Sequence, residues 1–396
     1  MSSLALSPDD PPRTRIELVG LVALIGFVAA LQFSIAAAQI LLTVVLLAWF
    51  GLLVADRERF AAPRFFWLLA GYAGMTLVSS VFSLDPRVSF VDDKQLLLFL
   101  IVPAVYRLAR GRRTDLLLMV MITVGAISAA VGVVQYGILN FNNLADRAHG
   151  TVGHYMTYSG LLMLVICVAL AKVLFSRDRI WPALMLPALL VAVAFTFTRN
   201  AWVGIGAAAA LLLSLKDVKL LWLLPVVLAL GLGLAPSRIT HRFYSIFNLH
   251  NPTNSDRIAM LQAGVHIVHD YPLTGVGPNM VERIYPKYRE PYAAPGNRPH
   301  LHNVPMQIAA ERGLPALAIW IGFVIVALLD LSRRFRLDRQ RVAAAAGLAS
   351  VVAMLAAGMF EHNFGNSEFL MLFLTLITLP FAAARTTDGS PAAPAA

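Results

Sequence analysis

Charged residues are scarce in this chain. Asp, Glu, Lys and Arg make up 14% of its 396 residues, whereas hydrophobic residues make up 58%. A soluble domain carries about a quarter charged residues, so this shortfall argues against a soluble protein. Apolar runs of about twenty residues recur along the chain, and they are continuous rather than alternating. This pattern predicts an all-α polytopic membrane protein and disfavours a membrane β-barrel.

Cysteine and intramembrane carboxylates are also nearly absent. The single cysteine, Cys167, lies inside an apolar run, which excludes an intramolecular disulfide and a cysteine metal site. Asp and Glu are almost missing from the middle of the apolar runs, whereas a proton-coupled transporter usually needs them near the bilayer centre. We find no convincing internal repeat, which argues weakly against an inverted-repeat transporter. The first apolar run lacks a small-residue cleavage site, so we interpret it as a retained helix.

The apolar runs predict twelve transmembrane helices. Their expected ranges are 17–33, 35–55, 63–82, 92–109, 115–139, 155–175, 180–198, 200–215, 218–235, 304–330, 342–362 and 366–385. Arginine and lysine are concentrated in the short segments that lie inside if the N terminus is cytoplasmic, as the positive-inside rule requires. Topology therefore explains much of the net charge of +10 without invoking nucleic acid. Both termini are predicted to be cytoplasmic.

This topology predicts five regions. They are a cytoplasmic tail at 1–16, helices one to nine at 17–235, one long periplasmic loop at 236–303, helices ten to twelve at 304–385, and a cytoplasmic tail at 386–396. Within the loop, Asn254-Ser255-Asp256 predicts the cap of an amphipathic helix that begins near Arg257. Its expected apolar face carries Ile258, Leu261, Val265 and Val268. A glycine-dependent turn follows, then a second helix at about 279–288.

Two histidines stand directly before the tenth predicted helix. His302 lies at its outer end, and an imidazole that titrates near neutrality suits a general base. The simpler interpretation is an interfacial histidine that hydrogen-bonds a loop. His300 comes two residues earlier and is expected to point elsewhere. No Asp, Glu or Cys cluster accompanies the pair in sequence, so we predict no metal site.

Two arginines occupy costly positions. Arg199 ends one predicted helix, with only Asn200 before the next, so it must either snorkel to the interface or bind an anion. Its planar guanidinium suits phosphate. Arg257 is expected at a helix N-terminus, where a cation is unfavourable unless a carboxylate such as Asp256 or a ligand phosphate pairs with it.

Glycines and short outer segments allow weaker predictions. Gly275 and Gly277 most simply serve backbone geometry in the loop turn, with a phosphate cradle as the alternative. The polar segments 83–94 and 140–155 are interpreted as solvated loops, either of which could line an outward-opening cavity. Glu361 and His362 end a predicted helix on the same side, and we interpret them as a structural pair.

Three segments, taken in order, resemble the O-antigen ligase and polymerase superfamily. They are TFTRNAWVG from Thr196, SDRIAMLQAGVHIVHDYPLTGVGPN from Ser255, and HLHNVPMQIAAERGLPAL from His300. Two departures from the family pattern occur: Thr198 stands where serine is common, and Met280-Val281 stands where an aromatic residue is common. Neither departure removes a charged group.

The resemblance implies a membrane-embedded, GT-C-like glycosyltransferase of the bacterial inner membrane, with its active site facing the periplasm. Such enzymes use glycans linked to undecaprenyl pyrophosphate, and ligases transfer them to a sugar hydroxyl of lipid A–core. The implied partners are this donor, this acceptor and membrane lipids, without nucleic acid, metal or other cofactor. Arg199 and Arg257 match the family's essential arginines, and His302 matches its essential histidine. The supporting candidates are His300, Asn303, Gly275 and Gly277.

Several alternatives remain open at this point. An O-antigen polymerase or a protein O-oligosaccharyltransferase shares these motifs and differs in its acceptor. We favour a ligase because polymerases often have two sizeable outer loops, whereas this chain shows one. From other classes, a transporter or flippase would need carboxylates or broken helices at mid-membrane depth. A structural scaffold would leave Arg199 and the histidine motif unexplained.

Overall fold

The computed structural model describes residues 12, 14–55, 57–248, 250–293, 296, 298–337 and 341–385. Regular elements in this part of the chain are all helical, and one isolated bridge joins Asn142 to Arg147. The predicted tail at 386–396 and residues 1–11 of the predicted N-terminal tail lie outside the described residues.

Most helices form one bundle. Its members are α1 (Arg15–Ala30), α2 (Ile35–Ala55), α3 (Phe65–Val81), α5 (Ile101–Leu108), α6 (Arg113–Gly137), α7 (Tyr155–Phe175), α8 (Ile180–Phe195), α9 (Arg199–Lys216), α10 (Leu223–Leu234), α14 (Val304–Phe335), α15 (Arg341–Gly358) and α16 (Ser367–Ala383). Short 3₁₀ helices are η1 (Asp93–Leu100), η2 (Val218–Trp222) and η4 (Asn363–Gly365). The bundle therefore contains helices at all twelve predicted positions.

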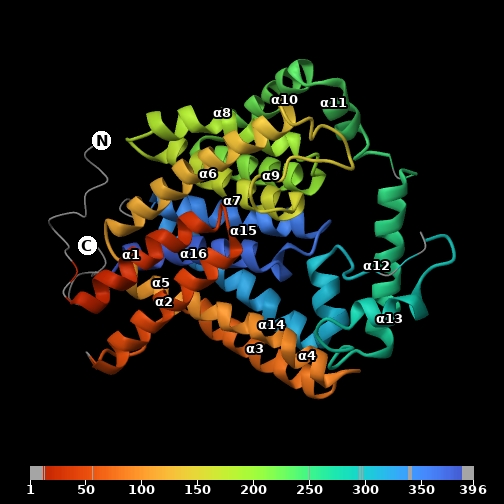
Figure 1. Ribbon diagram of the computed structural model, residues 1–396, viewed down its shortest axis with the longest axis horizontal. Coiled ribbons are helices and arrows are strands. Elements are labelled where there is room, and N and C mark those ends of the chain that lie inside the picture. The colour runs from red at the N-terminus through yellow and green to blue at the C-terminus, as the bar shows by residue number, and fades with distance from the viewer. Residues whose placement is uncertain are drawn as a thin grey trace.

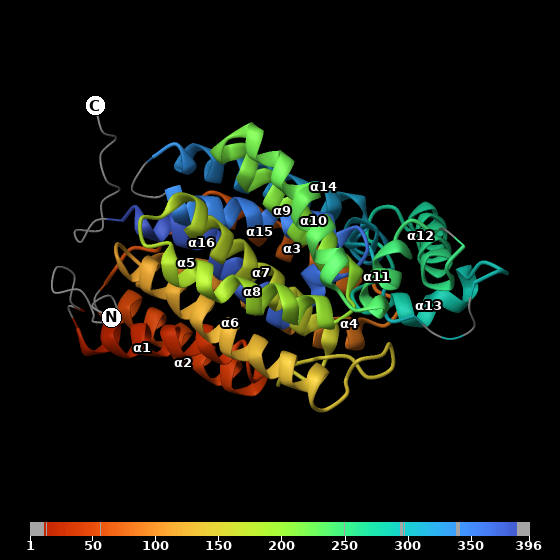
Figure 2. The same cartoon turned by 90° about the horizontal axis from the view of Figure 1, so that it is seen from above.

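Four further helices lie toward one end. These are α4 (Pro86–Asp92), α11 (Ser237–Tyr244), α12 (Pro252–Asp270) and α13 (Val281–Tyr288). Figures 1 and 2 show α11–α13 at the end of the bundle opposite the start of α1 and the end of α16. The segment predicted as one long outer loop thus gathers at a single end of the molecule.

The helices have the composition of a polytopic membrane protein. Five of those described, α2, α6, α7, α14 and α15, are long and apolar enough to cross a membrane, and shorter apolar helices such as α3, α8 and α16 accompany them. Helix α10 has no buried residue, and its Val226, Val227 and Leu230 are exposed, as expected of a lipid-facing surface. The count of twelve spans stays a prediction.

The segment predicted as a helix at 92–109 is helical but changes type along its length. The 3₁₀ helix η1 covers Asp93–Leu100, and α5 begins at Ile101. Pro103 explains the new start, because proline is tolerated in the first turn of a helix but removes a hydrogen bond inside one. Asp92, which directly precedes η1, lies near the outer end of α14, where its carboxylate is 3.7 Å from Arg312 Nη2.

Helices α7, α15 and α16 form the buried centre. Leu161 to Ala169 of α7 are all buried, as expected of a helix that is hydrophobic all round. Hydroxyl groups in this centre form hydrogen bonds within their own helix, since Ser350, Thr375 and Thr378 each donate to the carbonyl four residues earlier. The centre therefore holds few polar groups that need distant partners.

A charged cluster ties three helices together at the end where α1 begins. The carboxylate of Glu17 is fully buried and lies 2.7 Å from Arg113 Nη1 and 3.0 Å from Arg110 Nη2. Arg107 contacts the same carboxylate at 3.4 Å and makes a bidentate pair with Glu58. These contacts fix the start of α1 against the α5–α6 corner.

The outer segment docks on α14 through backbone hydrogen bonds. Gly313 breaks α14 with a φ of 80°, which frees backbone groups of the neighbouring turn. Val276 N donates to Ala310 O and Gly277 N to Glu311 O, each at 2.9 Å, and Leu314 N donates to Pro272 O at 2.8 Å. The turn at 272–278 is therefore held directly against a membrane helix.

The two loop glycines permit this close approach. Both have positive φ angles, 66° at Gly275 and 102° at Gly277. A Cβ atom at Gly275 would lie 2.3 Å from the carbonyl carbon of Glu311, and one at Gly277 would lie 2.0 Å from Ser83 Oγ. This geometry fits the predicted backbone role, and neither residue lines the cavity of the candidate site described below.

Helix α12, the first helix predicted within the outer loop, differs from its prediction in two ways. It begins at Pro252, where the Asn251 side chain accepts a hydrogen bond from Thr253 N, rather than near Arg257. Its buried face carries Met260, Ala263, Gly264 and Ile267, whereas three residues of the predicted face, Ile258, Leu261 and Val265, are exposed. The prediction was wrong because small residues give the closest approach to α14: Gly264 lies against Met306 and Leu301.

Candidate active site

His302 lies in a short segment clamped between α12, α14 and the end of α15. Asn303 caps α14 by accepting from Met306 N at 2.9 Å, and its amide donates to Met359 O at 3.2 Å. The side chain of Gln307 accepts from Leu301 N at 2.7 Å. His302 itself has a φ of 51°, a conformation in which histidine is enriched among non-glycine residues. The local structure thus fixes the backbone that carries the imidazole.

Glu361 orients the His302 ring. Its carboxylate, buried in the turn after α15, lies 2.9 Å from His302 Nδ1. A carboxylate can only accept here, so Nδ1 carries the proton and neutral His302 presents an unprotonated Nε2. Burial opposes ionisation of Glu361, but the His302 hydrogen bond, the charge of Arg257, and the charges that His302 and His300 carry once acid protonates them lower the pKa of Glu361 to about 2. The pair has the geometry of a general base held by a carboxylate.

His300 joins the same cluster, contrary to the expectation that it would point elsewhere. Its ring centroid is 4.2 Å from that of His302, and its Nε2 is 3.7 Å from Glu361 Oε1. The reason is that the side chain of Leu301 is buried in the apolar cluster that includes Met260 and Ile267 of α12. Because neighbouring side chains of an extended segment point to opposite sides, those of residues 300 and 302 point away from this cluster. Burial has the largest effect on His300 and lowers its pKa to about 4, although the charge of Glu361 opposes the shift.

The cluster has the residue types of a three-ligand metal site. Ligand atoms of His300, His302 and Glu361 lie within 4.8 Å of one another. Two ligands on one tetrahedral Zn²⁺, with bonds of about 2.1 Å, stand about 3.4 Å apart. The 2.9 Å contact between His302 and Glu361 is instead the length of a direct hydrogen bond. Glu361 thus supplies the carboxylate that the sequence pattern did not show beside the histidines, and its contact with His302 is a hydrogen bond.

Arg199 begins α9 and points into the outer region. It is only 5% exposed, and its guanidinium donates to Ser245 O at 2.9 Å, Ser245 Oγ at 3.1 Å and Asn254 Oδ1 at 2.7 Å. All three acceptors are neutral, and no carboxylate among the described residues forms an ion pair with it. The fork is thus preorganised by the outer helices while its charge stays uncompensated.

Arg257 is a second cation without an ion-pair partner in the described residues. Because α12 begins at Pro252, Arg257 lies in its second turn and not at its N-terminus as predicted. Asp256, the carboxylate suggested by sequence, pairs with Arg298 at 2.7 Å instead. Burial lowers the pKa of Arg257, while the more distant Glu361, Tyr155 and Asp256 partly oppose the shift. An anionic ligand would restore the balance of charge.

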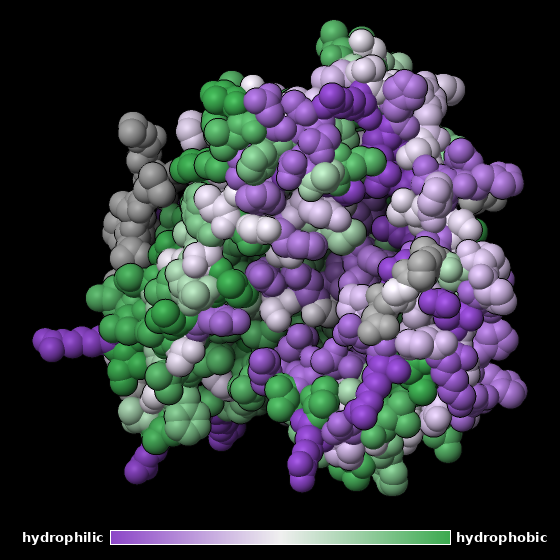
Figure 3. Space-filling view, turned by 45° about the vertical axis from the view of Figure 1, so that its right-hand side comes forward, coloured by the Kyte–Doolittle hydropathy of each residue, from purple (hydrophilic) through white to green (hydrophobic). Residues whose placement is uncertain are grey.

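The three predicted residues share one cavity. A hollow of about 200 Å³, called the reaction cavity below, is lined by Arg199, Arg257 and His302. Asn200, Asn254 and Asn303 also reach it, and its remaining lining is apolar: Val203, Ile246, Ile258, Leu261, Leu301, Met359 and Phe360. Figure 3 shows hydrophilic residues gathered around a hollow at this end, next to a hydrophobic flank. Two cations, one base and an apolar wall therefore meet at one place.

The family comparison covers the part of the chain that carries these residues. Residues 150–321 match the family model described as O-antigen ligase. The predicted resemblance is confirmed by this match, whose range contains all three sequence segments and both arginines, together with His302. No curated protein matches the chain. An O-antigen ligase match implies a glycosyltransferase-like membrane enzyme that acts on lipid-linked glycan and lipid A–core substrates in general.

Sequence reasoning missed two members of the site. Glu361 was interpreted as a structural helix-end residue, although its position on the outer side with His362 was a usable signal. Asn200 was treated only as the spacer after Arg199, yet its side chain reaches the reaction cavity. Glu361 lies beyond the matched family range, so only the fold brings it to His302.

Proposed function

We propose that this protein is an O-antigen ligase of the inner membrane, facing the periplasm. It transfers glycan from undecaprenyl pyrophosphate to a sugar hydroxyl of lipid A–core. The observation that carries the proposal is the reaction cavity, which combines the uncompensated Arg199 and Arg257 with the His302–Glu361 pair.

The arginines bind the donor's pyrophosphate. Arg199 offers a guanidinium already oriented by Ser245 and Asn254, and Arg257 adds a second charge from α12. Both stabilise the negative charge that grows on the pyrophosphate as it leaves, which is where preorganised cations contribute most to rate. Exposed apolar residues of α12, including Ile258 and Leu261, give the polyprenyl chain an apolar wall beside them.

His302 activates the acceptor. Its Nε2 takes the proton of the attacking hydroxyl while Glu361 stabilises the imidazolium that forms. The hydroxyl oxygen bonds to the anomeric carbon, and the bond from that carbon to the phosphate oxygen breaks. The electron pair leaves with undecaprenyl pyrophosphate, and attack from the opposite face inverts the anomeric centre.

Lipopolysaccharide banding in a deletion strain tests this function against the same-superfamily alternatives. We expect loss of the long ladder, accumulation of lipid-linked glycan, and restoration by the wild-type gene but not by His302→Ala. A core carrying one attached repeat would instead indicate a polymerase. A normal ladder would refute both activities.

A further inference from the structure

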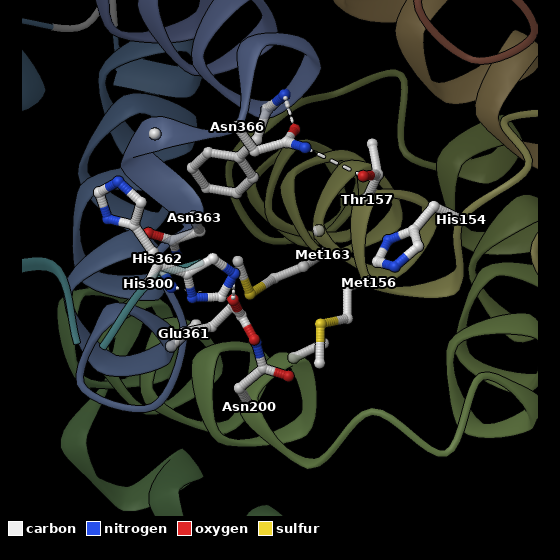
Figure 4. Close-up of a pocket in the computed structure, with 15 residues that line it drawn as sticks. His154, Met156, Thr157, Met163, Asn200, His300, Glu361, His362, Asn363 and Asn366 are labelled. Carbon is white, nitrogen blue, oxygen red and sulfur yellow. Dashed lines mark hydrogen bonds and ion pairs between the residues drawn. The ribbon is translucent and has the colours of Figure 1, made fainter. Parts of the chain in front are cut away.

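A second cavity lies behind the His300–Glu361 cluster. Its volume is about 210 Å³, and Figure 4 shows His154 on one side, Asn200 below, and His300, Glu361 and His362 opposite. Among the described residues, Asn200 alone lines both this cavity and the reaction cavity. His154, which is exposed, marks its outer rim, and the buried Met163 and Phe369 lie at its base. The second cavity is therefore adjacent to the base but separate from the arginines.

Asn200 is an unusual buried amide. It is 7% exposed, and its side chain has no hydrogen-bond partner among the described residues. An amide that faces a cavity and has no protein partner usually contacts water or a ligand there. Its place on the wall shared by two cavities means that a ligand in either cavity could hydrogen-bond it.

The second cavity offers hydrogen bonds without charge. No arginine or lysine lines it. Burial lowers the pKa of His300 to about 4 and that of His362 to about 3, so both imidazoles are neutral at pH 7. Thr157 Oγ accepts from Asn366 Nδ2 at 3.0 Å, which leaves the threonine O–H able to donate. Neutral donors and acceptors of this kind fit hydroxyl groups and do not fit a phosphate.

The size of the second cavity restricts the ligand further. Its volume of about 210 Å³ compares with about 30 Å³ of liquid volume for one water. It is also below the roughly 300 Å³ at which pockets for drug-sized ligands begin. One sugar ring fits inside this space, and the rest of a longer oligosaccharide would extend past the rim.

We propose that the second cavity binds the sugar ring of the acceptor that carries the attacking hydroxyl, with Asn200 hydrogen-bonding that ring. The inference rests on the proposed ligase function. His300, which lines the second cavity, has its ring 4.2 Å from that of His302, so a ring bound there is close to the base. The donor occupies the reaction cavity on the other side of Asn200. The attacking hydroxyl and the leaving pyrophosphate therefore lie on different sides of the donor's anomeric carbon.

Two-substrate kinetics of purified enzyme test the assignment. Donor is undecaprenyl-pyrophosphate-linked glycan, and acceptor is lipid A–core from a strain that makes no O-antigen. We expect Asn200→Ala to raise the acceptor KM about tenfold, the loss of one hydrogen bond, and to change the donor KM less, although Asn200 also lines the reaction cavity. Asn200→Ser, which keeps a short polar group, is expected to fall between wild type and Asn200→Ala. A shift of the donor KM alone, or an unchanged acceptor KM, would overturn the proposal.

Two further variants guard against misfolding. His154→Ala alters the exposed rim and is expected to raise the acceptor KM in the same direction. Thr151→Ala, on the same outer segment but lining neither cavity, is the matched control and is expected to leave both KM values unchanged. Equal effects from the control and His154→Ala would contradict a binding role.

A binding measurement separates failure of the site from failure of the function. Saturation-transfer NMR of the core oligosaccharide, released from lipid A by mild acid, needs no catalysis. We expect signals with wild type and their loss with Asn200→Ala. If transfer is absent but these signals behave as expected, the sugar site stands and the ligase proposal fails. If transfer occurs and the signals are the same for wild type and Asn200→Ala, the sugar site is refuted while the ligase proposal stands.

Discussion

Replacing Glu361 with glutamine tests the central pair most directly. The change keeps the size of the side chain but removes the charge 2.9 Å from His302 Nδ1. A glutamine amide can also donate to Nδ1, which would place the proton on Nε2 and abolish the base. Loss of a charged hydrogen bond is worth about 1.5–3 kcal/mol, or roughly a 10- to 150-fold loss of rate. A wrong tautomer would raise the loss toward about 10⁴-fold, as it does in serine proteases.

The assay is the initial transfer rate of purified protein at saturating donor and acceptor, compared with Glu361→Asp and His302→Ala. Since Glu361 acts through His302, the double variant is expected to be no slower than His302→Ala alone. Glutamine variants that retain the wild-type rate within about twofold would refute the orienting role. Independent, multiplying losses in the double variant would show that Glu361 acts elsewhere.

The same pair predicts how stability depends on pH. The pKa of Glu361 is lowered from an ordinary value of 4.5 to about 2 in the folded protein. A lowered carboxyl pKa stabilises the fold above the unfolded value, and this contribution disappears as pH falls from about 4.5 to about 2. The shift corresponds to about 3 kcal/mol. Thermal unfolding in nanodiscs is expected to show a steeper acid loss for wild type than for Glu361→Gln, and parallel curves would contradict it.

Three further substitutions test other parts of the structure. Arg199→Lys keeps the charge but loses the fork held by Ser245 and Asn254, so we expect a 10- to 100-fold lower transfer rate; near-normal activity would remove its phosphate role. Gly275→Ala places a Cβ against the Glu311 carbonyl, so we expect faster proteolysis of the outer segment, and unchanged cleavage would count against docking. Glu17→Gln leaves three arginines around a neutral group; we expect a loss of about 3 kcal/mol or failure to accumulate, and normal thermal stability would refute that estimate.

Local chemistry made much of the fold and part of the site predictable. Continuous apolar runs located the helices. Arg199 and Arg257 were chosen because their positions carry a cost that a ligand could offset, and His302 because an imidazole at the outer end of a helix suits a general base. Their shared cavity depends on long-range packing, which no local pattern encodes. Glu361 illustrates the limit, since it lies far along the chain from His302 and reaches it only because α15 packs beside α14.

The errors have physical causes of the same kind. The face of α12 was misjudged because helical periodicity identifies apolar residues without saying whether protein, lipid or substrate covers them. Ile258 and Leu261 line a cavity, while small Ala263 and Gly264 make the packing contact. The change of helix type within residues 92–109 followed from Pro103, whose effect depends on where the helix begins.

The docked turn at 272–278 has a consequence for which parts of this chain can vary in length. It joins the outer segment to α14 at a point between Arg257 and His302 in sequence. The distance between those two side chains therefore does not depend on the length of the segment that follows the turn. Extra residues inserted just after Tyr288 would form a longer surface loop and leave the distance between Arg257 and His302 unchanged. The same number inserted between Arg257 and Tyr271 would rotate one charge away from its neighbour.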